Sequence, residues 1–154
     1  MKLYLVQHAK AASKEEDPER GLSEEGRREI RKVAAFVKRF GLGVDCLWHS
    51  GKKRAAQTVE VLGEAINVKE GTAGRDGLGP NDDVTVLTDE LASTQKDIMI
   101  VGHLPFLSRL ASLLLAGSEW ANTVAFKNAG IVCLERSEDN RWQIDWMVTP
   151  ELLV

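Results

Sequence analysis

The sequence predicts a single α/β domain over residues 1–154, a three-layer α/β/α arrangement with a mostly parallel central sheet and an antiparallel edge. Three observations lead to this prediction. Short apolar runs alternate with segments in which apolar residues recur at helical spacing. The last two runs are joined by a short polar turn, as in a β-hairpin. The chain has the length of one domain, with no internal repeat and no linker rich in proline, glycine or serine.

Five runs have the character of strands: residues 3–6, 45–48, 98–101, 131–134 and 142–147. Apart from Asp45 at the start of the second, the first three are continuous and apolar, which is typical of strands buried in the centre of a parallel sheet. Because the first run begins so early, we expect the chain to start in the middle of the sheet. The last run alternates apolar and polar residues, and the polar turn at residues 137–140 predicts a hairpin. The Gly-rich residues 67–80 are expected to be irregular.

Four segments between these runs are predicted to be helices. The first begins at Ser23, a good N-cap residue followed by two glutamates, and ends at Gly41. Its apolar face is predicted to comprise Ile30, Val33, Ala34, Val37 and Phe40. Ser50 is expected to cap the second helix, and the other two cover residues 82–91 and 106–115.

Composition excludes several classes of protein. A formal net charge of −3 argues against a nucleic-acid-binding domain, which is usually strongly basic. The longest apolar stretch, residues 110–116, is too short to cross a bilayer, so no membrane association is expected. Cys46 and Cys133 lie in apolar runs and are expected to be buried thiols, as in a reducing compartment. With no signal-peptide core at the N-terminus, a cytoplasmic location is predicted.

All three histidines of the chain directly follow predicted buried strands. They are His8, His49 and His103. In open α/β sheets, ligands bind beyond the carboxyl ends of the strands. One such histidine alone is more readily explained as a strand-end residue, but three together indicate a single site.

A basic turn follows the second of these strands. Lys52, Lys53 and Arg54 stand near the start of the predicted second helix, where each cation opposes the helix dipole at a cost of roughly 0.3–1 kcal/mol. Exposed N–H groups at a helix start favour an anion such as phosphate. The turn therefore indicates a phosphate site, the alternative being a solvated basic surface.

Five ordered motifs resemble the histidine phosphatase superfamily, and within it the small bacterial SixA-type phosphohistidine phosphatases. They are LVQHAK at residues 5–10, LSEEG at 22–26, SGKKRAAQT at 50–58, LGPNDD at 78–83 and VGHLPFL at 101–107. The resemblance extends from residue 2 to about residue 150. It implies a phosphoglycerate mutase-like fold and a phosphatase that needs no cofactor.

The resemblance also implies roles for the candidate catalytic residues. His8 would attack phosphorus as a neutral imidazole and form a phosphohistidine that water then hydrolyses. Arg54 would hold the phosphoryl oxygens, and His103 would donate a hydrogen bond to them. A zinc site at His8 and His103 is the alternative, but the sequence offers no carboxylate or thiolate at metal-ligand spacing, so no metal is expected.

Gln7 departs from the family pattern, which has arginine at this position. Glutamine keeps two N–H donors but loses the charge, a loss of ~1.5–3 kcal/mol of phosphate stabilisation, or about ten- to a hundredfold in rate. Gln7, Lys10 and Ser50 are the predicted phosphate-binding residues, and Lys10, Lys52 or Lys53 is expected to restore a cation as a point charge. Residues 128–130 are expected to bring backbone N–H groups near the phosphate.

The lack of a clear general acid is a second departure, in this case from the superfamily members that cleave phosphate esters. Only Asp76, Asp82 and Asp83 lie in the corresponding loop, and the last two are expected to be helix N-terminal residues. A labile P–N bond needs less acid assistance. The substrate expected is therefore a phosphorylated protein such as a histidine phosphotransfer domain. Two alternatives stay open: a weakened protein that binds phosphohistidine or phosphate without turnover, and a broad small-molecule phosphomonoesterase.

Overall fold

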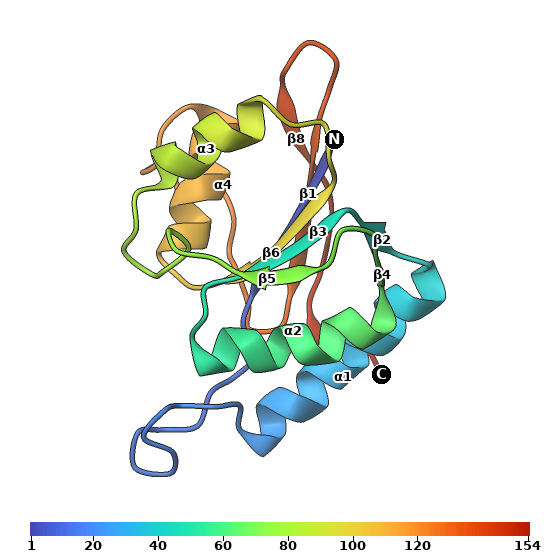
Figure 1. The fold of residues 1–154 in the computed structure, drawn as a ribbon, viewed down its shortest axis with the longest axis vertical. Helices are drawn as coiled ribbons and strands as arrows, with labels where there is room; N and C mark the ends of the chain where they lie inside the picture. Colours follow the sequence, from blue (N-terminus) through green and yellow to red (C-terminus); the bar gives the residue numbers. More distant parts are fainter.

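The computed structural model describes residues 1–154 and has a central six-stranded sheet between two layers of helices (Figure 1). In the order β5-β3-β6-β1-β7-β8, the strands are Thr72–Gly74, Cys46–His49, Ile98–Gly102, Lys2–Gln7, Ile131–Arg136 and Trp142–Val148. The first four are parallel to one another, whereas β7 is antiparallel to β1 and β8 is antiparallel to β7. The predicted fold class is confirmed, including the central first strand and the antiparallel edge.

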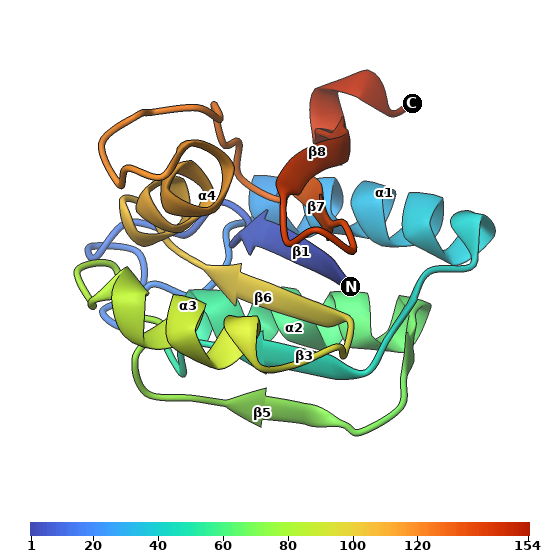
Figure 2. The same ribbon diagram turned by 90° about the horizontal axis from the view of Figure 1, so that it is seen from above.

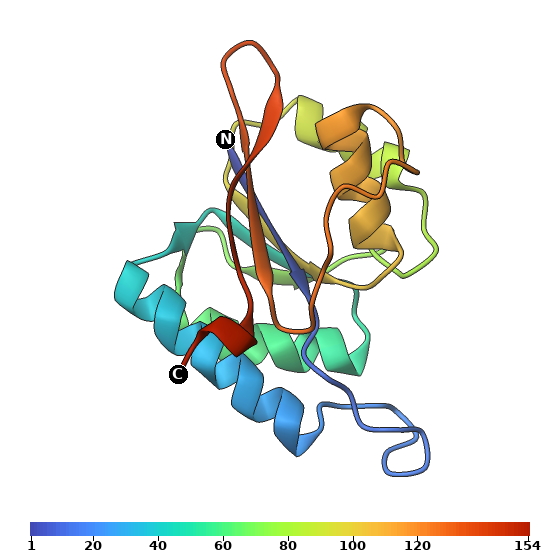
Figure 3. The ribbon, with the colours of Figure 1, turned by 180° about the vertical axis from the view of Figure 1, so that it is seen from behind.

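Helices cover both faces of the sheet (Figure 2). The helices α1 (Glu24–Phe40) and α2 (Lys53–Ala65) pack on one face, and α3 (Val84–Ala92) and α4 (Phe106–Ala116) pack on the other. A short 3-10 helix, Pro150–Leu152, follows β8 and lies against α1 (Figure 3). Side chains of β1 alternate between the two cores, because successive residues of a strand point to opposite faces.

The ends of α1 are those that the sequence predicts. The Ser23 side chain accepts a hydrogen bond from the Gly26 N–H, and Gly41 ends the helix in the left-handed region with a φ of 75°. The predicted cap of α2 was wrong: Lys52 is the N-cap residue and makes no side-chain cap bond. Gly51 has a φ of 88°, so the turn continues past Ser50, whose hydroxyl group contacts a histidine instead.

Three further expectations are corrected. Residues 67–80 are not wholly irregular, because β4 (Asn67–Val68) pairs with β2 (Gly43–Val44) and β5 joins the main sheet beside β3. These short, mostly exposed strands form through backbone pairing and carry no apolar pattern. Phe40 is 59% exposed, because it ends α1 beside Trp146 of the edge strand, where no further layer covers it. Cys46 is only partly buried at the start of β3, whereas Cys133 is buried.

The topology brings three predicted strand ends to one edge of the sheet. β1 and β3 flank β6 in parallel, so their carboxyl ends, each followed by a histidine, lie side by side. None of the four helices is long and apolar enough to cross a membrane.

Candidate active site

His8 and His103 meet at the carboxyl edge of the sheet, as the sequence places them. Their ring centroids are 5.0 Å apart, with an interplanar angle of 50°. The backbone N–H of His8 extends the pairing between β1 and β6 by donating to the Gly102 carbonyl oxygen at 3.0 Å. The two imidazoles are therefore held at the ends of adjacent central strands.

One hydrogen bond determines the tautomer of His8. Its Nδ1 lies 2.7 Å from the Ala9 carbonyl oxygen. A carbonyl oxygen only accepts, so Nδ1 carries the proton and Nε2 keeps its lone pair. Burial, and then the positive charges of Arg54 and Arg20, lower the pKa of His8, whereas the bond to Ala9 opposes them. His8 is therefore a neutral imidazole with a nucleophilic Nε2 at neutral pH.

His103 is buried and neutral, with one ring nitrogen free. Its side chain is 2% exposed, Nε2 lies 2.6 Å from the Ser50 hydroxyl oxygen, and Nδ1 is buried without a hydrogen-bond partner. Burial lowers the pKa of His103 to about 3, with further contributions from the charges of His8, Arg54 and Lys52. An anion in the site would oppose this shift, because a nearby negative charge favours the imidazolium.

Arg54 lies in the first turn of α2, and its backbone is tied to the segment that follows β1. The buried Thr58 hydroxyl donates to the Arg54 carbonyl oxygen at 2.7 Å and accepts from the Ala9 N–H at 3.0 Å. Burial, and then the charge of Arg20, lower the pKa of Arg54, although a guanidinium stays protonated at all ordinary pH values. No ion pair of the chain includes Arg54, so its charge is available to an anion.

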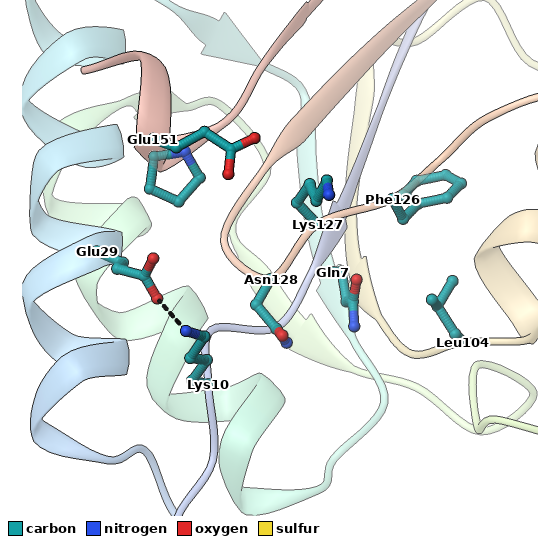
Figure 4. Close-up of a pocket in the computed structure, with 9 residues that line it drawn as sticks. Gln7, Lys10, Glu29, Leu104, Phe126, Lys127, Asn128 and Glu151 are labelled. Carbon is teal, nitrogen blue, oxygen red and sulfur yellow. Dashed lines mark ion pairs between the residues drawn. The ribbon is translucent and has the colours of Figure 1, made fainter.

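Gln7 and Lys10 line a pocket of about 290 Å³ together with Leu104 and Asn128 (Figure 4). The Lys10 ammonium pairs with Glu25 at 2.7 Å and with Glu29 at 3.9 Å. Its charge is thereby balanced on the α1 side, which disfavours the expectation that it replaces the missing arginine.

The other two lysines behave differently from each other. Lys53 pairs with Asp17 at 3.0 Å and with Glu19 at 3.5 Å, so it too is balanced. Lys52 makes no ion pair, and its charge contributes to the lowered pKa of His103. Of the three lysines proposed from the sequence, only Lys52 carries a free charge near the histidines.

The segment before β7 stabilises the end of β1. The Asn128 side chain donates to the His8 carbonyl oxygen at 2.8 Å, and the Ala129 N–H donates to the Gln7 carbonyl oxygen at 2.9 Å. The Gly130 N–H donates to a carbonyl of its own turn. The expectation that this segment offers N–H groups to phosphate was therefore wrong for Ala129 and Gly130, which already use theirs within the backbone.

Two aspartates border the site on the α3 side. Asp76 and Asp82 line a pocket of about 360 Å³ together with Ser50 and Lys52. Asp82 accepts from the Gly79 N–H at 2.7 Å, whereas the exposed Asp76 makes no hydrogen bond within the chain. As predicted, Asp83 is a helix N-terminal residue, since it caps α3 by accepting from the Thr85 N–H.

Arg20 is the site residue that sequence reasoning missed. It falls in a polar segment, residues 13–21, that reads only as an exposed loop. In the structure it is half-buried and its charge lowers the pKa of both His8 and Arg54. No periodicity or spacing marks it, because its position depends on how the loop packs against α2.

The third histidine lies outside this cluster. His49 Nδ1 accepts from the Gly51 N–H at 3.1 Å and so stabilises the turn before α2. No group of three or more histidine, cysteine, aspartate or glutamate side chains comes together as a metal site.

The chain resembles proteins of one superfamily in both sequence and fold. Residues 3–74, which include His8 and Arg54, match the family model of the histidine phosphatase superfamily (branch 1). An uncharacterized protein of Picosynechococcus sp. is 30% identical over 138 residues, covering 84% of this chain and 76% of its own length. Phosphohistidine phosphatase SixA of Escherichia coli is 23% identical over 155 residues, covering 97% of this chain and 94% of its own.

Solved structures with the same fold cover almost the whole chain. The protein histidine phosphatase SixA complexed with tungstate has a TM-score of 0.85 at 24% identity, covering 99% of each chain. The putative phosphohistidine phosphatase SixA from Agrobacterium tumefaciens has a TM-score of 0.76 at 26% identity, covering 96% of this chain and 97% of its own. The expected phosphoglycerate mutase-like fold is thereby confirmed.

Proposed function

The chain belongs to the histidine phosphatase superfamily, and we propose that it is a protein phosphohistidine phosphatase acting through a phosphohistidine intermediate on His8. The observation that carries this proposal is the state of His8. Its Nδ1 proton is held by the Ala9 carbonyl, so the Nε2 lone pair is free for attack beside a buried, neutral His103.

The reaction has two displacements at phosphorus. In the first, His8 Nε2 forms a bond to phosphorus while the P–N bond to the substrate imidazole breaks. The electron pair of that bond stays on the substrate nitrogen, which takes a proton from solvent. In the second, water attacks phosphorus and gives up a proton to solvent, the bond to Nε2 breaks with its electron pair left on that nitrogen, and inorganic phosphate and neutral His8 are released.

Arg54 and His103 stabilise the charge on the transferring phosphoryl group. The Arg54 guanidinium presents a planar fork that matches two phosphoryl oxygens. The His103 ring lies beside the nucleophile, with ring centroids 5.0 Å apart, and its Nε2 shares a hydrogen bond with the Ser50 hydroxyl, so this pair offers a hydrogen-bond donor to the phosphoryl group. With the guanidinium charge of Arg54 and this donor in place, the proposed reaction is metal-independent.

A phosphohistidine protein is the substrate class that these features favour. Its P–N bond breaks without a strong general acid, and no carboxylate contacts His8 or His103. The SixA relatives are named for this activity. We therefore propose a histidine phosphotransfer domain, or a similar carrier in the cytoplasm, as the partner. The free thiols of Cys46 and Cys133 fit that compartment.

Two other functions are favoured by single observations. The uncharged Gln7 favours a protein that binds phosphohistidine without turning it over. The position of Asp76 and Asp82 beside Ser50 favours a small-molecule phosphomonoesterase, in which an aspartate would protonate the leaving oxygen.

Single-turnover phosphate release from a phosphohistidine-bearing phosphotransfer domain tests the proposal. We expect native protein to release phosphate in the presence of EDTA, and His8→Ala to release none. Arg31→Ala, which alters an exposed arginine on α1, is the control and should keep the native rate. Binding of the phosphodomain without release by native protein would establish the reader function instead. Faster hydrolysis of an aryl phosphate, lost in Asp76→Asn, would establish the phosphomonoesterase.

A further inference from the structure

The phosphate site described so far holds only one guanidinium group, that of Arg54. A phosphoryl group carries about 1.5 to 2 negative charges at neutral pH. Arg54 contributes one full charge, whereas burial keeps His8 and His103 neutral in the free protein. Gln7 contributes none, and Lys10 is balanced by two glutamates. The unpaired Lys52 contributes a point charge, but an ammonium lacks the planar fork that binds two oxygens. A second guanidinium with free N–H groups is therefore to be sought around the site.

The loop between β1 and α1 is held against the segment that leaves His8. Ala11 and Leu22 form an antiparallel bridge, and the Ala12 N–H donates to the Gly21 carbonyl oxygen at 2.7 Å. Arg20 immediately precedes this paired stretch, so its backbone lies close to the chain just beyond His8.

The same loop is attached to the first turns of α2. Asp17 pairs with Lys53 at 3.0 Å, and the Gln57 side chain accepts from the Leu22 N–H at 2.8 Å. These two α2 residues stand on either side of Arg54 in the sequence. The loop thus bridges the two segments that carry the nucleophile and the phosphate-binding arginine.

The Arg20 side chain is fixed at one end and free at the other. Its Nε donates to the Ala12 carbonyl oxygen at 3.1 Å, and its backbone adopts a left-handed φ of 52°. No ion pair of the chain includes Arg20, so the two Nη groups face no carboxylate. Its charge lowers the pKa of both His8 and Arg54, which places the guanidinium within electrostatic reach of both.

We propose that Arg20 binds the phosphoryl group from the loop side and supplies the second guanidinium that the site lacks at Gln7. The inference deepens the proposed function and rests on it, since it assigns Arg20 to the same phosphate site. With Nε occupied by Ala12, the two Nη groups are available for two oxygens of a tetrahedral anion.

Tungstate, a phosphate-like dianion, gives a test that does not depend on turnover. We expect Arg20→Gln to weaken tungstate binding roughly ten- to a hundredfold by calorimetry, because charge-assisted bonds are lost. Glutamine keeps a donor for the Ala12 carbonyl, so the loop should remain in place. Arg31→Ala removes an exposed, unpaired arginine on α1 and should leave the affinity unchanged. An Arg20→Gln affinity within twofold of native would overturn the proposal.

Restoring the arginine at position 7 separates a binding role from a structural one. If the two positions serve the same anion, Gln7→Arg in the Arg20→Gln background should recover at least tenfold in tungstate affinity. A loss that stays unrepaired would assign Arg20 to loop structure. NMR titration gives a second readout: the pKa of His8 should rise in Arg20→Gln, because a nearby positive charge is removed.

The two proposals fail in different ways. If Arg20→Gln weakens tungstate binding while native protein releases no phosphate, Arg20 is a phosphate-binding residue in a protein that is not an enzyme. If native protein releases phosphate and Arg20→Gln binds tungstate like native, the phosphatase stands and the role of Arg20 is disproved.

Discussion

The chemistry of His8 is decided by its immediate neighbours. The Ala9 carbonyl holds the proton on Nδ1, and burial with two nearby guanidinium groups disfavours the imidazolium. The Ala9 bond raises the pKa but selects the tautomer that leaves the Nε2 lone pair free, and burial with the two guanidinium groups outweighs it and keeps the ring neutral. The strand end provides this state without a carboxylate to orient the ring.

The lowered pKa of His8 predicts the acid side of the pH profile. A histidine with the usual pKa of 6.5 would be largely protonated at pH 6, whereas His8 stays neutral to lower pH. We therefore expect the acid-side midpoint of kcat/KM to lie below 6.5, because kcat/KM reports the free enzyme. Stopped-flow measurements with a phosphohistidine protein, together with NMR titration of His8, give the two midpoints. A decline centred at or above 6.5 would show that the neutral form is not favoured.

For the individual site residues, the sequence predicted which side chains lie close together but not which hydrogen bonds they make. His8, His103 and Arg54 could be placed together because parallel strand ends share an edge. Ser50 was read as a helix cap, yet its hydroxyl lies 2.6 Å from His103, since Gly51 carries the turn beyond it. Arg20 was read as loop, because only tertiary packing brings residues 17–22 onto α2.

Contacts between secondary-structure elements fix the positions of these residues. α2 is attached to the His8 segment through the Thr58 hydroxyl, which contacts the backbone of Ala9 and Arg54 together. α1 is attached through its first turn, where Gly26 lies directly against Lys10. The long strands and helices followed from periodicity, whereas β2, β4 and β5 did not, because two- and three-residue strands are too short to show alternation.

Substitution by alanine is expected to have opposite effects on stability at Gly26 in α1 and at Gly63 in α2. A Cβ on Gly26 would overlap the Lys10 carbonyl oxygen, which is backbone and cannot move freely. Gly26→Ala should therefore lower the free energy of unfolding by roughly 1–3 kcal/mol and displace the segment after His8. A Cβ on Gly63 would meet Leu47 Cδ2 at an ordinary van der Waals distance of 3.7 Å. Gly63→Ala should therefore raise the free energy of unfolding by roughly 0.4–1 kcal/mol, because alanine has the higher helix propensity.

Urea unfolding of both variants measures these changes, and phosphate release measures the effect on the site. We expect only Gly26→Ala to slow phosphate release. Equal stability changes in the two variants would contradict the close contact between α1 and the strand exit.

The whole molecule is acidic, with a formal net charge of −3, but its active edge is not. Arg20, Lys52 and Arg54 carry charges without carboxylate partners on the loops and helix start that surround His8. The loops at residues 50–52 and 103–105 are short, and the longer loop after β1 is held down on α2, which leaves the edge accessible to a protein surface. A local positive field of this kind attracts an anionic partner before contact.

This charge distribution predicts a salt-dependent association with a phosphorylated protein. Raising the ionic strength from about 0.1 M to about 1 M shortens the Debye length from about 10 Å to about 3 Å. We expect kcat/KM to fall several-fold over this range while kcat changes little, because screening slows encounter more than chemistry. Lys52→Gln should flatten the dependence. Lys96→Gln removes the same charge just before β6, at the opposite edge of the sheet, and should leave the slope unchanged. Equal slopes for all three proteins would mean that overall charge, rather than the cations around His8, governs the encounter.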